Sequence, residues 1–199
     1  MRKTMFVLGG LVCATWLSAQ DYQKTAYGIK AAAGGVDVEV QFFTPSVVRV
    51  VKSPQGEHFE KKSLAVVASP GEVGVKVGIK DGAIVMDTKV LQVNLDTSTG
   101  AFSYRTADGK LLLAEKPVEK SFVPFDDAGD ATYNVYQAFK LDADEAIYGL
   151  GQLQNGKNVA KGRAEEHDSG ERGGCQSLLP VDQRLWLVLG QLFPHAFHG

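Results

Sequence analysis

Residues 36–42, Val36-Asp37-Val38-Glu39-Val40-Gln41-Phe42, alternate strictly between apolar and polar side chains. Successive side chains of a β-strand point to opposite faces, so this period of two predicts a strand with one buried face. Thr44-Pro45-Ser46 interrupts the pattern, and the β-branched run at 47–51 around Arg49 predicts a second strand. The two stretches together indicate a β-protein.

The same signals continue along the chain. Alternation over residues 73–79 predicts a strand that ends at the turn Asp81-Gly82, and residues 84–95 predict the next strand. Residues 96–100 form a second turn cluster, and Asp108-Gly109 lies between two apolar runs as a hairpin signal. No window between residues 20 and 157 shows a sustained helical period. Short strands with regular turns predict an all-β fold, an antiparallel β-sandwich.

Composition limits the function classes. The chain has 199 residues, of which 44% are hydrophobic and 22% charged, and its formal net charge is -2. This is ordinary for a globular domain with an adequate core. A near-neutral balance argues against nucleic-acid binding, and two distant cysteines argue against a small disulfide-rich fold. After the first twenty residues, no stretch is long and apolar enough to span a membrane.

The first segment has the layout of a secretory signal peptide. A positive start at residues 2–3 precedes an apolar stretch at 5–17 and a small-residue exit. We therefore expect residues 1–19 to be removed before Gln20, and the mature chain to be secreted, with the bacterial periplasm as its destination. Lipidation at Cys13 is disfavoured because a bulky valine precedes it.

Composition changes after Lys157. Residues 20–157 contain a single His and no Trp or Cys, whereas residues 158–199 contain three His, one Trp and one Cys, and no Ile, Thr, Tyr or Met. The tail therefore does not continue the strand pattern of the body. We predict a β-sandwich over residues 20–157 and an aberrant tail over 158–199 that is not a domain.

The tail offers no convincing chemical site. It contains four residues of zinc-ligating type, His167, Cys175, His195 and His198, but their spacing is irregular. Glu165, Glu166 and Asp168 beside His167 are typical of a solvated loop. A Ser-His-Asp reading of Ser169 lacks the strand–turn–helix context that such a nucleophile needs. We predict no metal and no cofactor here.

Carboxylates in the body could serve two kinds of chemistry. A calcium site would use the acidic stretch Asp126, Asp127 and Asp130, but its spacing is not that of a dedicated loop, and a polar surface loop is favoured. Acid/base catalysis of glycoside hydrolysis would use two of Glu115, Glu119 and Glu145. Nothing in the sequence places two of them at the required separation, so we predict no catalytic residue.

Other body residues have simpler interpretations. His58 is expected to be an exposed loop histidine. Tyr133, Tyr136 and Phe139 fall at helical spacing, but the flanking turns favour a strand or loop that carries core residues. A sugar-stacking platform made by these three rings is the alternative.

Two phrases carry a family resemblance. Residues 43–52, Phe43-Thr44-Pro45-Ser46-Val47-Val48-Arg49-Val50-Val51-Lys52, look like an early strand pair of glycoside hydrolase family 31. Residues 144–152, Asp144-Glu145-Ala146-Ile147-Tyr148-Gly149-Leu150-Gly151-Gln152, followed by Gln154-Asn155-Gly156, are similar to its segment E-x-x-Y-G-L-G-Q/E. The resemblance covers residues 30–157.

The resemblance implies a galactose-mutarotase-like sandwich that precedes a (β/α)8 barrel. In that family the barrel hydrolyses α-linked xylosides or glucosides with an aspartate nucleophile and an aspartate acid/base. The nucleophile lies in a Trp-x-Asp-Met-Asn strand, and neither Trp16 nor Trp186 begins such a sequence. The resemblance therefore implies a non-catalytic fragment, incomplete at its carboxyl end, whose expected partners are carbohydrate and the missing barrel.

Our hypothesis for the tail is a single-nucleotide frameshift. Codons compatible with residues 183–195, read one nucleotide later, give K-G-Y-G-L-F-W-D-N-Y-S-P, which resembles the next strand of family 31 sandwiches. Most of these codons are degenerate, so the shifted sequence is partly a matter of codon choice. Trp186 before Leu187 leaves no such choice, because this pair must give Gly in the shifted frame. One extra A after an AAA codon for Lys157 would produce the shift. The alternatives left open are a free-standing carbohydrate-binding sandwich and a secreted structural or adhesive sandwich.

Overall fold

The computed structural model describes residues 22–57 and 66–141, and the backbone of residues 177–181 and 185–189. All of its elements are strands, and the described residues include no helix that could cross a membrane. The predicted signal peptide lies outside the described residues. The all-β prediction is confirmed.

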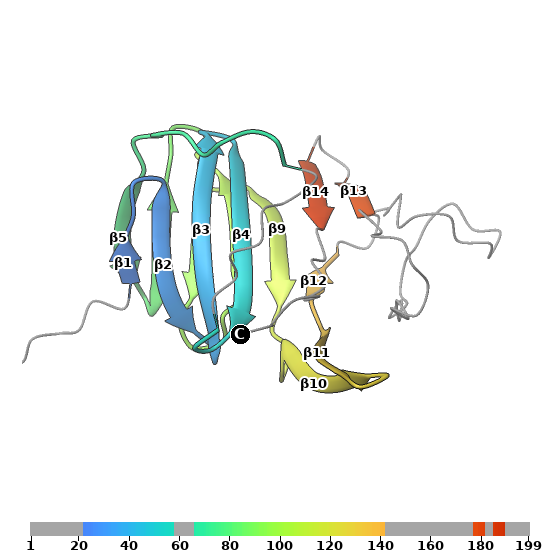
Figure 1. Cartoon of the computed structure of the whole chain (residues 1–199). Helices are drawn as coiled ribbons and strands as arrows, with labels where there is room; N and C mark the ends of the chain where they lie inside the picture. The colour runs from blue at the N-terminus through green and yellow to red at the C-terminus, as the bar shows by residue number, and fades with distance from the viewer. Residues whose placement is uncertain (1–21, 58–65, 142–176, 182–184, 190–199) are drawn as a thin grey trace, which may run out of the picture.

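Two antiparallel sheets face each other in Figure 1. The first sheet has the order β1 (Tyr22–Lys24), β2 (Gly28–Ala33), β3 (Val36–Thr44) and β4 (Val47–Pro54). The second has the order β12 (Ala138–Lys140), β9 (Leu111–Lys116), β8 (Phe102–Thr106), β7 (Leu91–Asp96), β6 (Ala83–Asp87) and β5 (Lys76–Lys80). Two separate hairpins complete the list: β10 (Phe122–Asp127) with β11 (Asp130–Val135), and β13 (Ser177–Val181) with β14 (Leu185–Leu189).

The core fills the space between the two sheets. In β3 the alternation works as predicted, because Val36, Val38, Val40 and Phe42 are all buried. The rest of the core comes from β2 and from the opposite sheet: Ile29, Ala33, Ile84, Met86, Leu91, Val93, Leu95 and Phe102. Burial of these side chains is the main force that holds the sheets together.

The predicted strand at 84–95 is wrong in one respect, because the structure divides it into β6 and β7. Thr88 makes the turn: its backbone N–H donates to the Leu91 carbonyl at 2.9 Å, and its hydroxyl accepts the Leu91 N–H at 2.9 Å. Local bonding of this kind competes with a continuous strand. As a result Ile84 and Met86 face the core, and Val85 is only half-buried.

The predicted turns are present. Asp81 (φ 52°) and Gly82 (φ 77°) both have positive φ between β5 and β6, as a two-residue hairpin turn of this kind requires. β5 begins at Lys76 rather than at residue 73, and Val73 and Val75 pack on the core as half-buried side chains.

Two sheet edges meet on one side of the sandwich. β4 is the last strand of the first sheet, and β12 with β9 ends the second. Figure 1 shows β4, β9 and β12 on the same side, with the β10–β11 hairpin extending from it. The most polar interior contacts of the described residues lie at this edge.

Candidate functional site

Glu115 is the buried charged residue of the sandwich. Among residues 22–57 and 66–141 it is the one polar or charged residue in the buried class, with 6% of its surface exposed. It lies near the end of β9, directly after the apolar run at 111–114. A buried carboxylate is costly unless it is paired and hydrogen-bonded, so its partners define the site.

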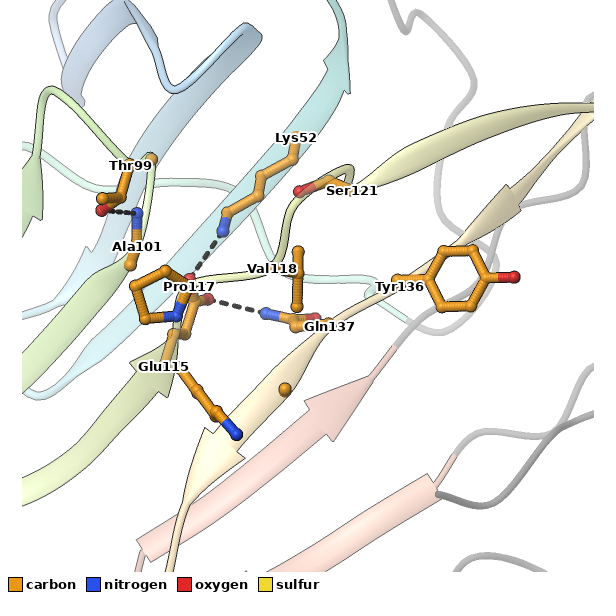
Figure 2. Close-up of a pocket in the computed structure, with 12 residues that line it drawn as sticks. Lys52, Thr99, Ala101, Glu115, Pro117, Val118, Ser121, Tyr136 and Gln137 are labelled. Atoms are coloured by element: carbon orange, nitrogen blue, oxygen red, sulfur yellow. Dashed lines mark hydrogen bonds and ion pairs between the residues drawn. The ribbon is translucent and has the colours of Figure 1, made fainter.

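Three donors converge on the Glu115 carboxylate, and Figure 2 shows two of them, Lys52 and Gln137. Lys52 Nζ donates to Oε2 at 2.6 Å, and the backbone N–H of Phe102 donates to the same oxygen at 3.0 Å. Gln137 Nε2 donates to Oε1 at 2.7 Å. Both oxygens are therefore occupied, and the charge is balanced by one ammonium group.

Lys52 reaches Glu115 from the opposite sheet. It lies on β4, and its side chain is 16% exposed against 4% for that of Glu115. Its Nζ is also 5.2 Å from the centroid of the Phe102 ring, a cation–π distance. The pair thus connects β4 to β9 and β8 across the end of the core.

A small polar hollow opens above this pair, with an empty volume of about 240 Å³ that includes open solvent. Its walls come from β4, the turn before β8, the end of β9 and the link between β11 and β12. Hydrolysis by a carboxylate pair needs a second carboxyl group a few ångströms away. Glu115 has instead a lysine and a glutamine, so the arrangement is that of a structural ion pair.

The other predicted carboxylates do not join Glu115. Glu119 is exposed after the end of β9, and Glu145 lies outside the described residues. Asp126, Asp127 and Asp130 are exposed, as expected of a polar surface segment, and lie at the tip of the β10–β11 hairpin. Asp126 Oδ1 accepts the Gly129 N–H at 2.9 Å, which is a turn contact. Within the described ranges, no group of three metal-ligating side chains comes together.

The three predicted aromatic residues do not form one platform. Tyr133 lies on β11 with a half-buried ring, and its hydroxyl donates to Glu57 Oε1 at 2.6 Å. This bond raises the pKa of Tyr133, with smaller contributions from burial and the Glu57 charge. Tyr136 is 51% exposed in the link to β12, and Phe139 is half-buried on β12. The predicted strand-or-loop placement is confirmed, but none of the three residues belongs to the buried core as expected.

The negative charge of Glu115 also affects the pKa of Tyr104. Burial raises its pKa far above the ordinary value, and the negative charge of Glu115 adds to the effect. Its ring stacks on Phe102 with centroids 6.1 Å apart and planes 17° from parallel. The end of the core therefore combines an ion pair with two stacked rings.

Sequence reasoning named Glu115 but missed Lys52 and Gln137. The available signal was a charged residue at the end of each of two apolar strand runs, 47–51 and 111–114. Nothing in the sequence says that these strands belong to facing sheets. His58, the tail candidates His167, Cys175, His195 and His198, the polar cluster 165–168 and Ser169 lie outside the residues whose side chains the structure describes.

The fold and the sequence define the class of protein. The glycosyl hydrolase 31 N-terminal galactose mutarotase-like domain matches residues 37–169, more than half of the chain. The chain belongs to this family of β-sandwich domains. The matched range runs past Lys157, and the domain boundary expected there stays a prediction.

Individual relatives agree. An α-xylosidase of Saccharolobus solfataricus is 28% identical over 136 residues, which are 68% of this chain and 18% of that protein. The crystal structure of a GH31 α-xylosidase from Xanthomonas citri aligns with a TM-score of 0.59 and 30% identity, over 66% of this chain and 15% of that one. A GH31 α-xylosidase from a soil metagenome, complexed with xylose, aligns with a TM-score of 0.53 and 19% identity, over 72% of this chain and 24% of that one, and supports the fold alone. The chain spans less than a quarter of the length of these relatives.

Proposed function

We propose that this chain is the amino-terminal, non-catalytic part of a secreted α-xylosidase-like hydrolase of glycoside hydrolase family 31. The observation that carries the proposal is that both α-xylosidases with about 30% identity match this chain over its sandwich, which is 15 to 18% of their own length. The buried carboxylate of Glu115 is paired with the ammonium group of Lys52. The catalytic acid and nucleophile are then expected in the part of the enzyme that follows the sandwich.

Resequencing of the coding DNA tests the proposal first. The read should extend from the codon of Gln152 to well past the stop codon. We expect one A fewer after the Lys157 codon, and a corrected frame that continues into a barrel with a Trp-x-Asp strand. An unchanged frame with no barrel-coding sequence behind it would overturn the proposal and favour a free-standing carbohydrate-binding sandwich.

Activity measurements separate the two forms of the protein. The chain with the present sequence should release no nitrophenol from 4-nitrophenyl α-D-xyloside or α-D-glucoside. The frame-corrected protein should hydrolyse the xyloside faster, since the two relatives that carry the proposal are α-xylosidases. Hydrolysis by the chain with its present sequence would contradict a non-catalytic role.

Secretion is part of the proposal and has its own test. The charged start, apolar stretch and small-residue exit of residues 1–19 support export to the periplasm. Amino-terminal sequencing of the exported protein should then begin at Gln20. A cytoplasmic protein that retains Met1 would contradict export.

A further inference from the structure

Residues 122–140 form a continuous segment at the edge of the sandwich where β4 and β9 lie. The segment comprises the β10–β11 hairpin, which is a sheet of its own, the link at residues 136–137, and the short edge strand β12. Figure 1 shows the hairpin and β12 next to this edge. We call residues 122–140 the strap.

The strap has few apolar contacts with the sandwich. None of its residues, all of which the structure describes, is fully buried. Phe122 packs against the main core, and Phe139 is half-buried on β12. β12 pairs with β9 at three positions, and a two-stranded hairpin on its own is at best marginally stable. Segments that bury so little apolar surface open locally at a lower free energy than the core does.

The hairpin and β12 follow one another with almost no chain between them. The Tyr136 N–H donates to the Ser121 carbonyl at 2.8 Å, which extends the hairpin ladder to residue 136, and the pairing of β12 begins at Ala138. Gln137 alone lies between these two points, and one residue has only two freely rotating backbone angles. Residues 117–120 lie outside any strand between β9 and the strap, and most of them are exposed. We therefore expect the hinge of the strap at 117–120.

Two polar contacts hold the strap against the sandwich. Gln137 Nε2 donates to Glu115 Oε1 at 2.7 Å, and the Tyr133 hydroxyl donates to Glu57 Oε1 at 2.6 Å. Glu115 is buried whereas Glu57 is half-buried, so the Gln137 bond is the better protected from water. Figure 2 shows the Gln137 side chain pointing at Glu115 from the strap.

Glu115 connects the strap to both sheets. Its other oxygen, Oε2, accepts Lys52 Nζ from β4 and the Phe102 N–H from β8. The sandwich itself therefore holds the carboxylate in place and leaves Oε1 for Gln137. Residues 136–138 of the strap line the hollow above the ion pair, so displacement of the strap would admit water to it.

We propose that the strap opens from the sandwich as one unit around a hinge at residues 117–120, and that Gln137 is the latch that holds it closed. In the closed form the strap covers the Lys52–Glu115 pair. In the open form Glu115 exchanges the Gln137 amide for water, while Lys52 continues to balance its charge. The inference goes beyond the proposed function and does not depend on it.

Hydrogen–deuterium exchange of the full chain, read for each amide by NMR, tests the unit and the latch. In the unchanged protein the amides of β10, β11 and β12 should share one opening free energy. Gln137→Ala should speed exchange in all three strands about five- to tenfold, while the amides of β3 and β7 keep their rates. Gln137→Glu places a second carboxylate against Glu115 and should speed exchange in the strap by more than about tenfold.

The matched control is Asn134→Asp. It adds the same charge as Gln137→Glu at an exposed position of the hairpin, and it should change the exchange rates by less than about twofold. Access to Glu115 is a second measurement: conversion of its carboxylate by a water-soluble carbodiimide and glycine ethyl ester should be faster in Gln137→Ala than in the unchanged protein. Peptide mass spectrometry measures this conversion.

Three results would overturn the inference. Faster exchange of β12 in Gln137→Ala with unchanged β10 and β11 would show that the strap is not one unit. Equal exchange in Gln137→Ala and the unchanged protein would show that Gln137 is not the latch. Acceleration that includes β3 and β7 would show that the whole domain is destabilised rather than the strap opened. Each result leaves the DNA test of the proposed function unaffected.

Discussion

Lys52 Nζ lies 2.6 Å from Glu115 Oε2, and this contact joins the edge strand β4 of one sheet to β9 of the other. Both side chains are largely removed from water. An ion pair in such a place contributes little net stability by its presence, but loss of one partner leaves a buried charge. A slipped arrangement of the two sheets would separate the charges, so we expect the pair to favour the observed one.

Lys52→Met should destabilise the domain strongly. The variant leaves the Glu115 carboxylate buried with no cation, at a cost of about 3–5 kcal/mol in the free energy of unfolding. Adding Glu115→Leu should restore a large part of this loss, since the double variant has no buried charge. Urea unfolding monitored by circular dichroism measures both.

The matched control for this prediction is Lys30→Met. Lys30 pairs with Glu39 at 3.8 Å on the open surface, with side-chain exposures of 55% and 32%. Its loss should change the free energy of unfolding by less than about 1 kcal/mol. If Lys52→Met cost no more than Lys30→Met, the pair between the sheets would have no special role.

Gly34→Ala tests the corner where the two sheets meet. Gly34 has φ +58°, and a Cβ there would lie 2.3 Å from the backbone carbonyl of Thr99 in the opposite sheet's β7–β8 turn. Gly35 has φ +76° with nothing within 4 Å of its Cβ position. Gly35→Ala should therefore cost only backbone strain of about 1–2 kcal/mol, and Gly34→Ala at least about 1 kcal/mol more. Equal thermal unfolding midpoints would show that the turns do not touch in solution.

Sequence periodicity was sufficient to predict where the strands lie, but not which strands lie next to or opposite one another. Val36 to Phe42 could be assigned to a buried face because side-chain alternation is a local property. The break at Thr88 was not predicted, although residues 87–89 are polar, because it depends on the hydrogen bonds that Thr88 makes with Leu91 and not on the apolar pattern.

The candidate site, too, could be predicted only in part from the sequence. Glu115 could be singled out as a carboxylate, but Lys52 is 63 residues away in sequence and Gln137 is 22 residues away. Contacts at such separations follow from the order of strands in two sheets. The alternative of a sugar-stacking platform fails for a local reason: Tyr133 and Tyr136 are three positions apart, which places them on opposite faces of an extended chain.

Tyr104 gives the domain an alkaline instability. Burial, with a smaller contribution from Glu115, raises its pKa above the ordinary value of 10.0, so the folded protein keeps its proton at a pH where the unfolded chain loses it. The unfolded state then binds fewer protons, and stability falls as pH rises above 10 by up to about 1.4 kcal/mol per pH unit. Below pH 9, Tyr104 makes no pH-dependent contribution to the free energy of unfolding.

Comparison with Tyr104→Phe isolates the effect. The difference in unfolding free energy between the two proteins should be constant from pH 7 to about 9, and should shift in favour of Tyr104→Phe above about pH 10. Tyr27→Phe, at a ring that is 40% exposed, is the control. Parallel curves for wild type and Tyr104→Phe up to the alkaline transition would contradict the burial of this hydroxyl.

Tyr133→Phe should loosen the β10–β11 hairpin without unfolding the sandwich. The variant removes the 2.6 Å bond to Glu57 but keeps the ring that meets Phe122. A hydrogen bond to a charged group is worth about 1.5–3 kcal/mol, and partial exposure here reduces that to about 1 kcal/mol. Backbone amides of β10 and β11 should therefore exchange with deuterium about five- to tenfold faster, while those of β3 and β7 keep their rates. Tyr136→Phe removes a hydroxyl from the exposed face of the same hairpin, so it serves as the control. Equal exchange in the two variants would mean that the Glu57 contact does not hold the hairpin to the sandwich.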